Sequence, residues 1–389
     1  MLICAISISH HPIFVKQISY ISIALIDFFH TLCYTGDIII LEGVIRMKIF
    51  ECKDLPIKVF GLMNFYKNGS LMRLPEEMME KMPQLRQFGS RSTGGRIGFR
   101  TNSKNLYVKL VSKTFIRDSF VPQTASSGLD VYIGERTEGK FLGTVFPTGL
   151  RGTNPNESEK NFELYGEMTD ITMFMPKNEQ IENVYIGIED DADIEAPTPY
   201  ENEKPVIIYG SSITEGGCAG RVGNAYNATL SRWLNMDYIN FGFSGSAKGE
   251  PEMAEFIASV PMSIFVMDYD YNAPDALHLQ KTHEPFYQII REKNPTLPII
   301  MLSNPNYRIK KEDSEARLAI IRTTYENALK NGDKNVYLIS GENFYDENDP
   351  YSCTMDNVHP NDIGMQRMAR EIRKTLEPVF RAVVEAEKI

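Results

Sequence analysis

Hydrophobic and polar residues alternate in short runs from about Phe50 to Glu189. In the run NLYVKLV, for example, Leu106, Val108 and Leu110 occupy every second position. Several such runs separated by turn residues predict the strands of an antiparallel sandwich or jelly roll. The other runs of this kind are RIGFRT, GLDVYIGE, NFELYG, DITMFMP and NVYIGIE. A single helical patch, from Leu74 to Met82, interrupts them.

The pattern changes after residue 189. Segment 190–205 is acidic, contains three prolines and lacks apolar periodicity, which is typical of a linker or a segment wrapped over the surface. Beyond it, five apolar runs alternate with five helical stretches, which predicts a doubly wound parallel α/β sheet with its active site beyond the carboxyl ends of the strands. The apolar runs are PVIIYG, YINFGFS, SIFVMDYD, LPIIMLS and NVYLIS. The last helix is expected to start near Asn361 and to kink or break at Pro378.

These patterns divide the chain into a β-sandwich domain at 47–189, a linker at 190–204 and an α/β domain at 205–389. Residues 1–46 are apolar but patternless, and their longest apolar run, Ile18 to Ile26, is too short to span a membrane. They contain neither a charged start nor a small-residue cleavage site. We favour an upstream extension, with an atypical export leader or interfacial anchor as the alternative. The compartment therefore stays open, with the cytoplasm slightly favoured.

Composition narrows the classes of function. The 389 residues carry 41 Lys and Arg against 51 Asp and Glu, and a net charge of −10 repels phosphate backbones. We therefore expect no nucleic-acid partner, and no stable membrane insertion either. Five Cys without a CxxC pair indicate neither a disulfide framework nor a zinc knuckle. No HExxH, GxGxxG or P-loop occurs, so we expect no metal and no nucleotide cofactor.

The first candidate for chemistry is GSSIT, which directly follows the first strand of the α/β domain. A serine at such a turn, here Ser212, presents its hydroxyl above the sheet beside the free N–H groups of a helix N-terminus. A helix cap or a phosphate-cradling loop would also place small polar residues directly after this strand.

The second candidate is DNVHP, just before the last helix. His359 lies there three residues after Asp356, so one segment supplies the imidazole base and the orienting carboxylate that a serine nucleophile needs. His278 and His283 fall in a predicted helix, where packing or exposure explains them. The alternative for His359 is an exposed loop histidine beside a capping carboxylate.

Two further residues can stabilise an oxyanion. Gly245 follows the second strand, where the backbone can approach a substrate closely, and Asn272 follows the third, with a side-chain amide able to donate. Gly245 or Asn272, taken alone, is equally typical of a turn. Nucleophile, glycine, asparagine and Asp/His nevertheless all fall at carboxyl ends of strands, which favours one common site.

This arrangement resembles the SGNH (GDSL-like) hydrolase superfamily. GSSIT is similar to its first block, usually GDSxT, and NFGFSG, YDYNAP and DNVHP are similar to its second, third and fifth blocks. The strings GSSITEGGCAGRVG and MDYDYNAP resemble one acylhydrolase subgroup in which a β-sandwich precedes the hydrolase domain. GLDVY, residues 128–132, resembles the GxDLY signature of that sandwich.

The resemblance implies a role for each residue. Ser212 is the nucleophile, His359 the base and Asp356 its orienting carboxylate. The backbone N–H groups of Ser212 and Gly245, with the Asn272 amide, form the oxyanion hole. Ser211 replaces the usual Asp of the first block, which puts the bracing of this loop in doubt. The third block is YDYN rather than the commoner GxND, which leaves Asn272 less secure.

A few neighbouring residues have open interpretations. Arg221 follows the first block and either lines the substrate pocket or is an ordinary surface arginine. Cys218 and Cys353 are expected to border the site as buried thiols. Asp268 and Asp270 flank the third strand end, and we favour loop bracing over a metal role for both.

The expected activity is a two-step transfer of an acyl group to water through an acyl-enzyme. The sandwich resembles carbohydrate-binding folds, and relatives in the superfamily remove acetyl groups from saccharides. We therefore expect a small acyl group, acetyl, on a sugar hydroxyl, with a small-molecule or oligosaccharide ester as partner. The alternatives are a short-chain carboxylesterase, thioesterase or lysophospholipase, and a non-catalytic carbohydrate-binding protein. The sequence leaves the oligomeric state open.

Overall fold

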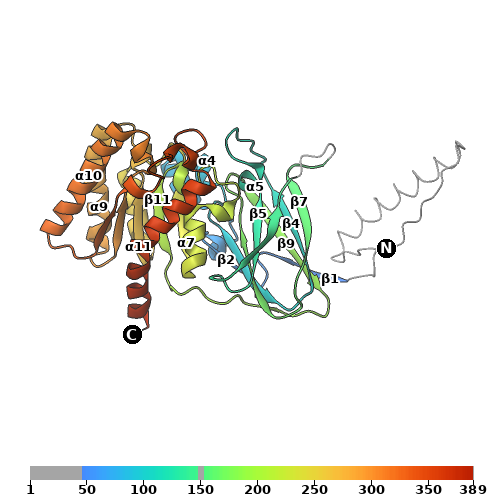
Figure 1. Ribbon diagram of the computed structural model, residues 1–389. Coiled ribbons are helices and arrows are strands. Elements are labelled where there is room, and N and C mark those ends of the chain that lie inside the picture. The colour runs from blue at the N-terminus through green and yellow to red at the C-terminus, as the bar shows by residue number, and fades with distance from the viewer. Residues whose placement is uncertain (1–45, 148–152, 389) are drawn as a thin grey trace, which may run out of the picture.

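A computed structural model of the chain describes residues 46–147 and 153–388 (Figure 1). The expectations for an N-terminal extension therefore fall almost entirely outside the described residues. In the described ranges, no helix is long and apolar enough to cross a membrane.

Two antiparallel sheets form the N-terminal half, as the period-two runs predict. One sheet has the strand order β1-β9-β4-β7 and the other the order β10-β3-β8-β5-β6, with β2 paired to β3. The strands are β1 (Met47–Glu51), β2 (Lys58–Phe60), β3 (Arg96–Thr101), β4 (Asn105–Ser112), β5 (Leu129–Ile133), β6 (Lys140–Val145), β7 (Glu157–Glu163), β8 (Thr169–Phe174), β9 (Ile181–Glu189) and β10 (Ile194–Glu195). Alternate residues such as Ile97, Val108 and Val184 are buried in one core between the sheets.

Short helices interrupt this half more often than the sequence predicts. The expected helical patch at 74–82 contains one of them, and the others fall where no periodic pattern is long enough to be recognised. They are α2 (Phe65–Asn68), α3 (Glu76–Lys81), η1 (Pro83–Leu85), α4 (Arg86–Gly89) and α5 (Gln123–Ser126).

The acidic segment 190–205 is in part a strand. Ile194–Glu195 forms β10 on the edge of the sheet, and Tyr200 packs beneath the guanidinium of Arg136, 3.9 Å from the ring centroid. The segment is therefore wrapped along the sandwich, the second of the two expected alternatives. The domain boundaries placed at residues 189 and 205 stay a prediction.

A five-stranded parallel sheet forms the C-terminal half. Its order is β12-β11-β13-β14-β15, with the topological switch point beside β11, where ligands bind in open α/β sheets. The strands are β11 (Val206–Gly210), β12 (Tyr238–Gly242), β13 (Ile264–Asp268), β14 (Ile299–Leu302) and β15 (Val336–Ile339). The helices are α6 (Ser212–Glu215), η2 (Val222–Asn224), α7 (Tyr226–Leu234), α8 (Pro251–Ser259), η3 (Asp270–Asn272), α9 (Ala276–Lys293), η4 (Pro305–Arg308), α10 (Lys311–Lys330), η5 (Gly341–Asn343), η6 (Pro350–Cys353) and α11 (Asp362–Glu387).

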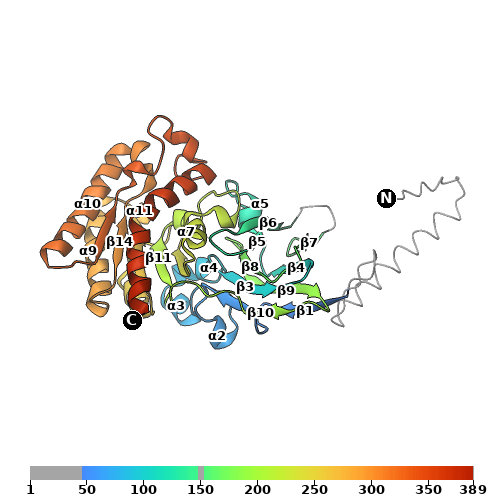
Figure 2. The same cartoon turned by 60° about the horizontal axis from the view of Figure 1, so that its bottom comes forward.

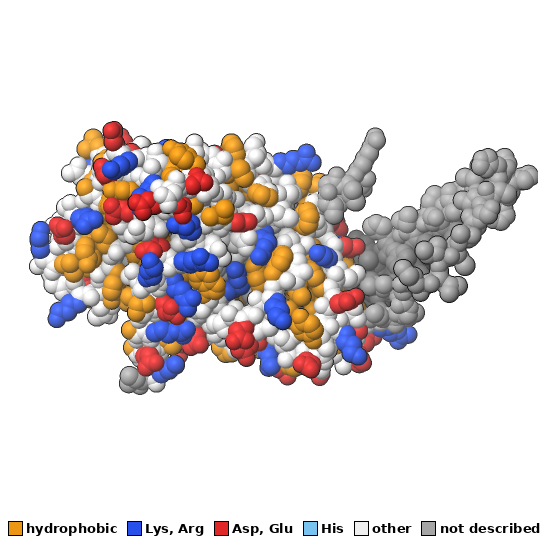
Figure 3. All heavy atoms as spheres, in the orientation of Figure 1, with side chains coloured by type: hydrophobic (Ala, Val, Ile, Leu, Met, Phe, Trp, Pro, Cys, Tyr) orange, Lys and Arg blue, Asp and Glu red, His pale blue; other side chains and the backbone are white. Residues whose placement is uncertain are grey.

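Helices cover both faces of this sheet, so the fold is doubly wound as expected. Alternate strand residues pack against α8, α9 and α10 on one face and against α7 and α11 on the other (Figure 1). Helix α11 continues through Pro378 to Glu387, and its ribbon bends along its length, so of the expected kink or break the break is absent (Figures 1 and 2). Figure 3 shows cationic and anionic side chains interspersed over one face of the molecule.

The GLDVY segment joins the two halves. In β5, Leu129, Val131 and Ile133 face the sandwich core, so Asp130 and Tyr132 project from the opposite face. That face meets the loop that follows α6. The Asp130 carboxylate accepts hydrogen bonds from the Gly223 N–H at 2.9 Å, from Arg221 at 3.2 Å and from the Thr144 hydroxyl at 2.6 Å. The Arg221 guanidinium also donates to the Tyr132 hydroxyl.

We predict that Asp130→Ala lowers the free energy of unfolding by roughly 2–4 kcal/mol, because the buried Gly223 N–H and Thr144 hydroxyl lose their acceptor. Urea unfolding followed by the fluorescence of Trp233, the only Trp of the chain, measures this. Glu195→Ala is the control, since Glu195 forms an exposed ion pair with Arg100 that contributes less than about 1 kcal/mol. Equal losses in the two variants would contradict the prediction.

Candidate active site

The GSSIT turn places Ser212 at the first position of α6, directly beyond β11. Gly210 is required before it, because a Cβ at that position would lie 2.0 Å from Thr214 Oγ1. Ser211 caps the helix by accepting the Ile213 N–H at 3.1 Å. The serine that replaces the usual aspartate therefore still braces the loop.

Ser212, His359 and Asp356 lie in one hydrogen-bonded line. Ser212 Oγ is 2.8 Å from His359 Nε2, and His359 Nδ1 is 2.8 Å from Asp356 Oδ2. Asp356 Oδ1 also accepts the backbone N–H of His359 at 2.7 Å. Burial raises the pKa of Asp356, but these hydrogen bonds from His359 outweigh it, so the net pKa is below the ordinary 3.8. An ionised carboxylate only accepts, which assigns the proton to Nδ1 and leaves Nε2 free to accept the serine hydroxyl.

The loop that carries His359 is held from a neighbouring strand end. Asn306, in η4 after β14, donates its side-chain amide to the Val358 carbonyl at 3.0 Å. Asn304 orients it by accepting the Asn306 N–H, and Asn304 in turn donates to Asp270 at 3.0 Å. The sequence analysis missed both asparagines. An Asn-Pro-Asn turn after a buried strand was the available signal.

The three expected oxyanion donors lie around the same strand ends. Gly245 has φ +66°, a conformation that favours glycine, and a Cβ added to it would meet no atom within 4 Å. Across the described residues, the N–H groups of Gly245 and Ser212 donate to no acceptor. The Asn272 amide donates to the Phe243 carbonyl at 2.8 Å, which leaves its second N–H for a ligand.

Asp268 and Asp270 brace these loops. Asp268, at the end of β13, accepts hydrogen bonds of 2.7 Å from Thr214 of the serine turn and from the Tyr226 hydroxyl. Burial is the main cause that raises the pKa of Asp268 to about 7, and neighbouring Asp270 adds to it. Burial likewise raises the pKa of Asp270 to about 6. No group of three or more His, Cys, Asp or Glu side chains within 46–147 and 153–388 is placed to hold a metal ion.

Both cysteines border the site. The Cys218 N–H donates to the Pro360 carbonyl, and the Cys353 carbonyl accepts from Asn361, so each contacts the segment around His359. Both thiols are buried and unpaired, and burial raises the pKa of Cys218 to about 11, so this thiol is not nucleophilic near neutral pH.

His278 and His283 lie in α9, away from this centre. His283 is buried and bonds Thr324 Oγ1 at 2.9 Å, and burial lowers its pKa to about 3. His278 Nε2 lies 2.8 Å from the Lys248 carbonyl.

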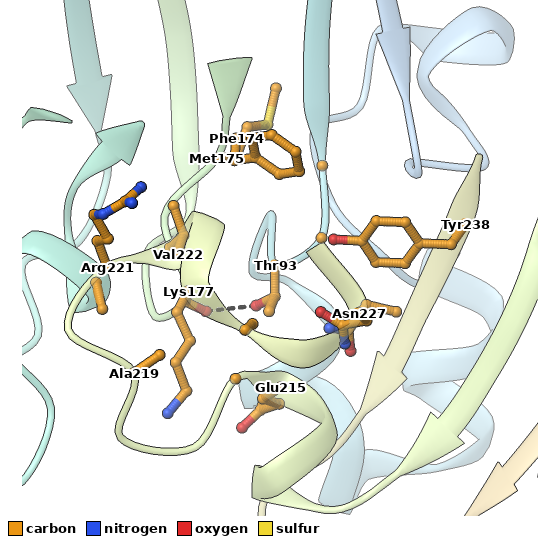
Figure 4. Close-up of a pocket in the computed structure, with 16 residues that line it drawn as sticks. Thr93, Phe174, Met175, Lys177, Glu215, Ala219, Arg221, Val222, Asn227 and Tyr238 are labelled. Atoms are coloured by element: carbon orange, nitrogen blue, oxygen red, sulfur yellow. Dashed lines mark hydrogen bonds between the residues drawn. The ribbon is translucent and has the colours of Figure 1, made fainter. Parts of the chain in front are cut away.

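The N-terminal half also reaches beneath the serine turn. Arg73, fully buried, donates to Glu215 at 2.9 Å and to the Gly242 carbonyl at 2.7 Å. Lys177 donates to the Gly217 carbonyl at 2.7 Å. A cavity of about 20 Å³, room for one water, lies between the halves beside Lys177 and Glu215, with Arg221 on its wall (Figure 4). Arg221 donates to Asp130 and Tyr132 and also lines a second groove, between α7 and α11. Its role in substrate binding stays a prediction.

Comparisons with known proteins identify a family for each half of the chain. Residues 203–377 match the GDSL-like lipase/acylhydrolase family, and residues 47–194 match GxDLY, the N-terminus of SGNH-hydrolase-type esterases. No curated protein matches.

Several solved structures are similar over both halves. A structure described as a GDSL-like lipase from Bacteroides ovatus ATCC 8483 is 25% identical, with a TM-score of 0.76, over 86% of this chain and 98% of that chain. The salicylyl-acyltransferase SsfX3 from a tetracycline biosynthetic pathway is 19% identical, with a TM-score of 0.69, over 87% and 99%. An acetyl xylan esterase from Butyrivibrio proteoclasticus is 13% identical, with a TM-score of 0.53, over 85% and 98%.

We predict that Asn306→Ala lowers kcat by roughly ten- to a hundredfold at nearly unchanged KM, because the His359 loop loses its support while substrate contacts remain. The exposed Asn331 supplies the control, Asn331→Ala, and ester hydrolysis is the assay. Equal kcat values for the two variants would show that Asn306 does not position the loop.

A second prediction concerns pH. Unfolded Asp268 ionises near pH 3.8, whereas the folded protein keeps this proton until about pH 7, so the folded state binds more protons between those values. The free energy of unfolding should therefore fall across this window because of Asp268, by at most about 4 kcal/mol. Asp268→Asn removes this contribution. Urea unfolding at about pH 4.5 and about pH 8 should show a smaller loss in the variant than in the wild type, and parallel losses would refute the assignment.

Proposed function

Since the chain belongs to the SGNH (GDSL-like) hydrolases with a GxDLY N-terminal domain, and is thus a hydrolase of ester bonds, we propose that Ser212, His359 and Asp356 form its catalytic triad and that it removes acetyl groups from carbohydrates. The observation that carries the triad is the hydrogen-bonded line of 2.8 Å and 2.8 Å from Ser212 through His359 to Asp356. Exchange of Ser212 and measurement of ester hydrolysis test it.

In the proposed first step, Ser212 Oγ attacks the ester carbonyl carbon while its proton passes to His359 Nε2. Asp356 stabilises the imidazolium that forms. The C–O bond to the sugar then breaks, His359 returns the proton to the departing sugar oxygen, and an acetyl-Ser212 ester remains. In the second step, water loses a proton to His359 and attacks this ester, which releases acetate and restores the serine hydroxyl.

Three donors are proposed to stabilise the tetrahedral oxyanion. They are the N–H groups of Ser212 and Gly245, which have no acceptor among the described residues, and the second N–H of the Asn272 amide. The Ser212 N–H is also the first of the N–H groups at the start of α6, and the Ser211 cap bonds the next one, that of Ile213.

The carbohydrate substrate is supported at the level of the fold. A structure named as an acetyl xylan esterase and one named as a family two carbohydrate esterase in complex with cellohexaose have TM-scores of 0.53 and 0.52 to this chain. Both match over more than 70% of the chain, which includes the sandwich as well as the hydrolase half. The alternative is a short-chain carboxylesterase, thioesterase or lysophospholipase that acts on a non-sugar ester.

We predict that the wild type hydrolyses p-nitrophenyl acetate faster than the octanoate ester and that Ser212→Ala loses roughly 10⁴-fold or more of kcat, as in other serine triads. Ser259→Ala, at an exposed serine of α8, is the control and should keep full activity. Activity that survives in Ser212→Ala would disprove the triad, and a preference for octanoate would favour the lipase-like alternative. Release of acetate from acetylated xylo-oligosaccharides then tests the carbohydrate substrate.

For the oxyanion hole, we expect Asn272→Ala to lower kcat by roughly 100- to 1000-fold, about 3–4 kcal/mol of transition-state stabilisation. KM should stay within a few-fold, because the donor acts on charge that develops only in the transition state. Asn331→Ala again provides the matched control. A rise in KM alone would move Asn272 from the oxyanion hole to ground-state binding.

A further inference from the structure

A groove of about 320 Å³ lies between α7 and the first turns of α11, beside η2. Its volume is within the range of small-ligand sites, roughly 300–1,000 Å³. The residues of this α7–α11 groove that matter here are Asn224, Thr229, Arg232, Trp233, Asp362 and Gln366.

Three of these side chains have unused hydrogen-bonding capacity. Within the described ranges, the amides of Asn224 and Gln366 and the hydroxyl of Thr229 form no hydrogen bond. Thr229 is 6% exposed and lines the groove, and its hydroxyl has no protein partner among the described residues. Amides and hydroxyls both donate and accept, as sugar hydroxyls do.

The charged side chains of the groove are, by contrast, already engaged. The Arg232 guanidinium donates to the Gly223 carbonyl at 2.5 Å, and Asp362 Oδ1 accepts the Gly220 N–H at 2.8 Å. Arg221, which also lines the groove, is paired with Asp130. The groups of the groove without a protein partner in the described part of the chain are therefore neutral, and they suit the hydroxyls of an uncharged ligand. These bonds also hold the walls in place before a ligand binds, which reduces the entropy lost on binding.

The indole of Trp233 supplies an apolar surface beside these polar groups. It is partly buried against α11, and the Arg373 guanidinium lies over its ring at 5.6 Å from the centroid, so the ring is held in position. An aromatic ring next to uncharged polar side chains suits the alternating apolar and hydroxyl surfaces of a sugar.

The groove adjoins both segments of the candidate centre. Asp362 lies three residues after His359, and the Gly220 N–H that it accepts belongs to the loop after the Ser212 helix.

We infer that the α7–α11 groove is an accessory subsite for a neutral oligosaccharide, separate from the Ser212 centre. It retains the chain while its ester groups are hydrolysed. This inference rests on the carbohydrate substrate of the proposed function.

The only Trp of the chain lies in this groove, so tryptophan emission reports on it directly. Xylohexaose, cellohexaose and mannohexaose are titrated into Ser212→Ala, which prevents turnover. We expect a saturable change in Trp233 emission with at least one of them. In the Asn224→Ala/Gln366→Ala variant, Kd should rise roughly 4- to 100-fold, since each of the two neutral hydrogen bonds contributes a factor of about 2–10. Gln288→Ala, on the exposed face of α9, should leave Kd unchanged.

Kinetics separate the two proposals. In the double variant with Ser212 intact, KM for acetylated oligosaccharides should rise several-fold at constant kcat, while hydrolysis of p-nitrophenyl acetate stays unchanged. Deacetylation of saccharides without any Trp233 response would overturn the subsite and leave the proposed function intact. A Trp233 response without deacetylation would show that the groove binds a sugar, but it would overturn the carbohydrate substrate of the centre and with it the accessory role of the groove. Hydrolysis of p-nitrophenyl acetate without saccharide deacetylation and without a Trp233 response would overturn both the carbohydrate substrate and the subsite.

Discussion

The buried carboxylate of Glu215 is the point at which the two halves of the molecule depend on each other. Glu215 ends the four-residue helix that Ser212 begins, and its side chain is 1% exposed. A charge removed from water this completely is tolerated only with a partner, and Arg73 from the N-terminal half provides it at 2.9 Å. Arg91, from the same half, approaches to 3.8 Å.

The position of the serine turn follows from this pair. Arg73 also donates to the carbonyls of Asn240 and Gly242, so one guanidinium joins α6 to the end of β12. On the opposite side of the turn, Asp268 accepts from Thr214. The turn that carries the candidate nucleophile is therefore held by the buried side chains of Arg73 and Asp268, whereas among the described residues the Ser212 hydroxyl bonds His359 alone. Rigid support of this kind keeps a nucleophile and its base in reacting geometry.

Local sequence patterns predict much of the fold and the candidate triad. They predict few of the long-range contacts that hold the triad residues in place. The β11 and β13 strands are continuous apolar runs, and GSSIT and DNVHP each place their polar atoms within a few residues. The β2 and β10 strands have three and two residues, too few to show alternation. Arg73 and Glu215 are 142 positions apart, and no pattern along a chain connects residues at such a separation.

Helix α11 and Asn306 also show where prediction from the local sequence fails, for two different reasons. Pro378 is expected to kink or break the helix because it lacks an N–H; α11 bends but continues, with Val379, Phe380 and Val384 buried in the core beneath the sheet. Tertiary packing there outweighs the local preference. Asn306 acts through a single contact with Val358, across 52 positions, and an asparagine beside a proline looks like any turn residue.

The Arg73–Glu215 pair has a consequence for how such a protein can change over generations. Exchange of the N-terminal half for an unrelated module would remove Arg73 and leave the buried Glu215 carboxylate without an ion-pair partner, three residues from Ser212. Recombination at the segment between the halves is therefore penalised even where each half carries a complete core. The two halves are expected to be inherited as one unit, and substitutions at Arg73 and Glu215 to arise together.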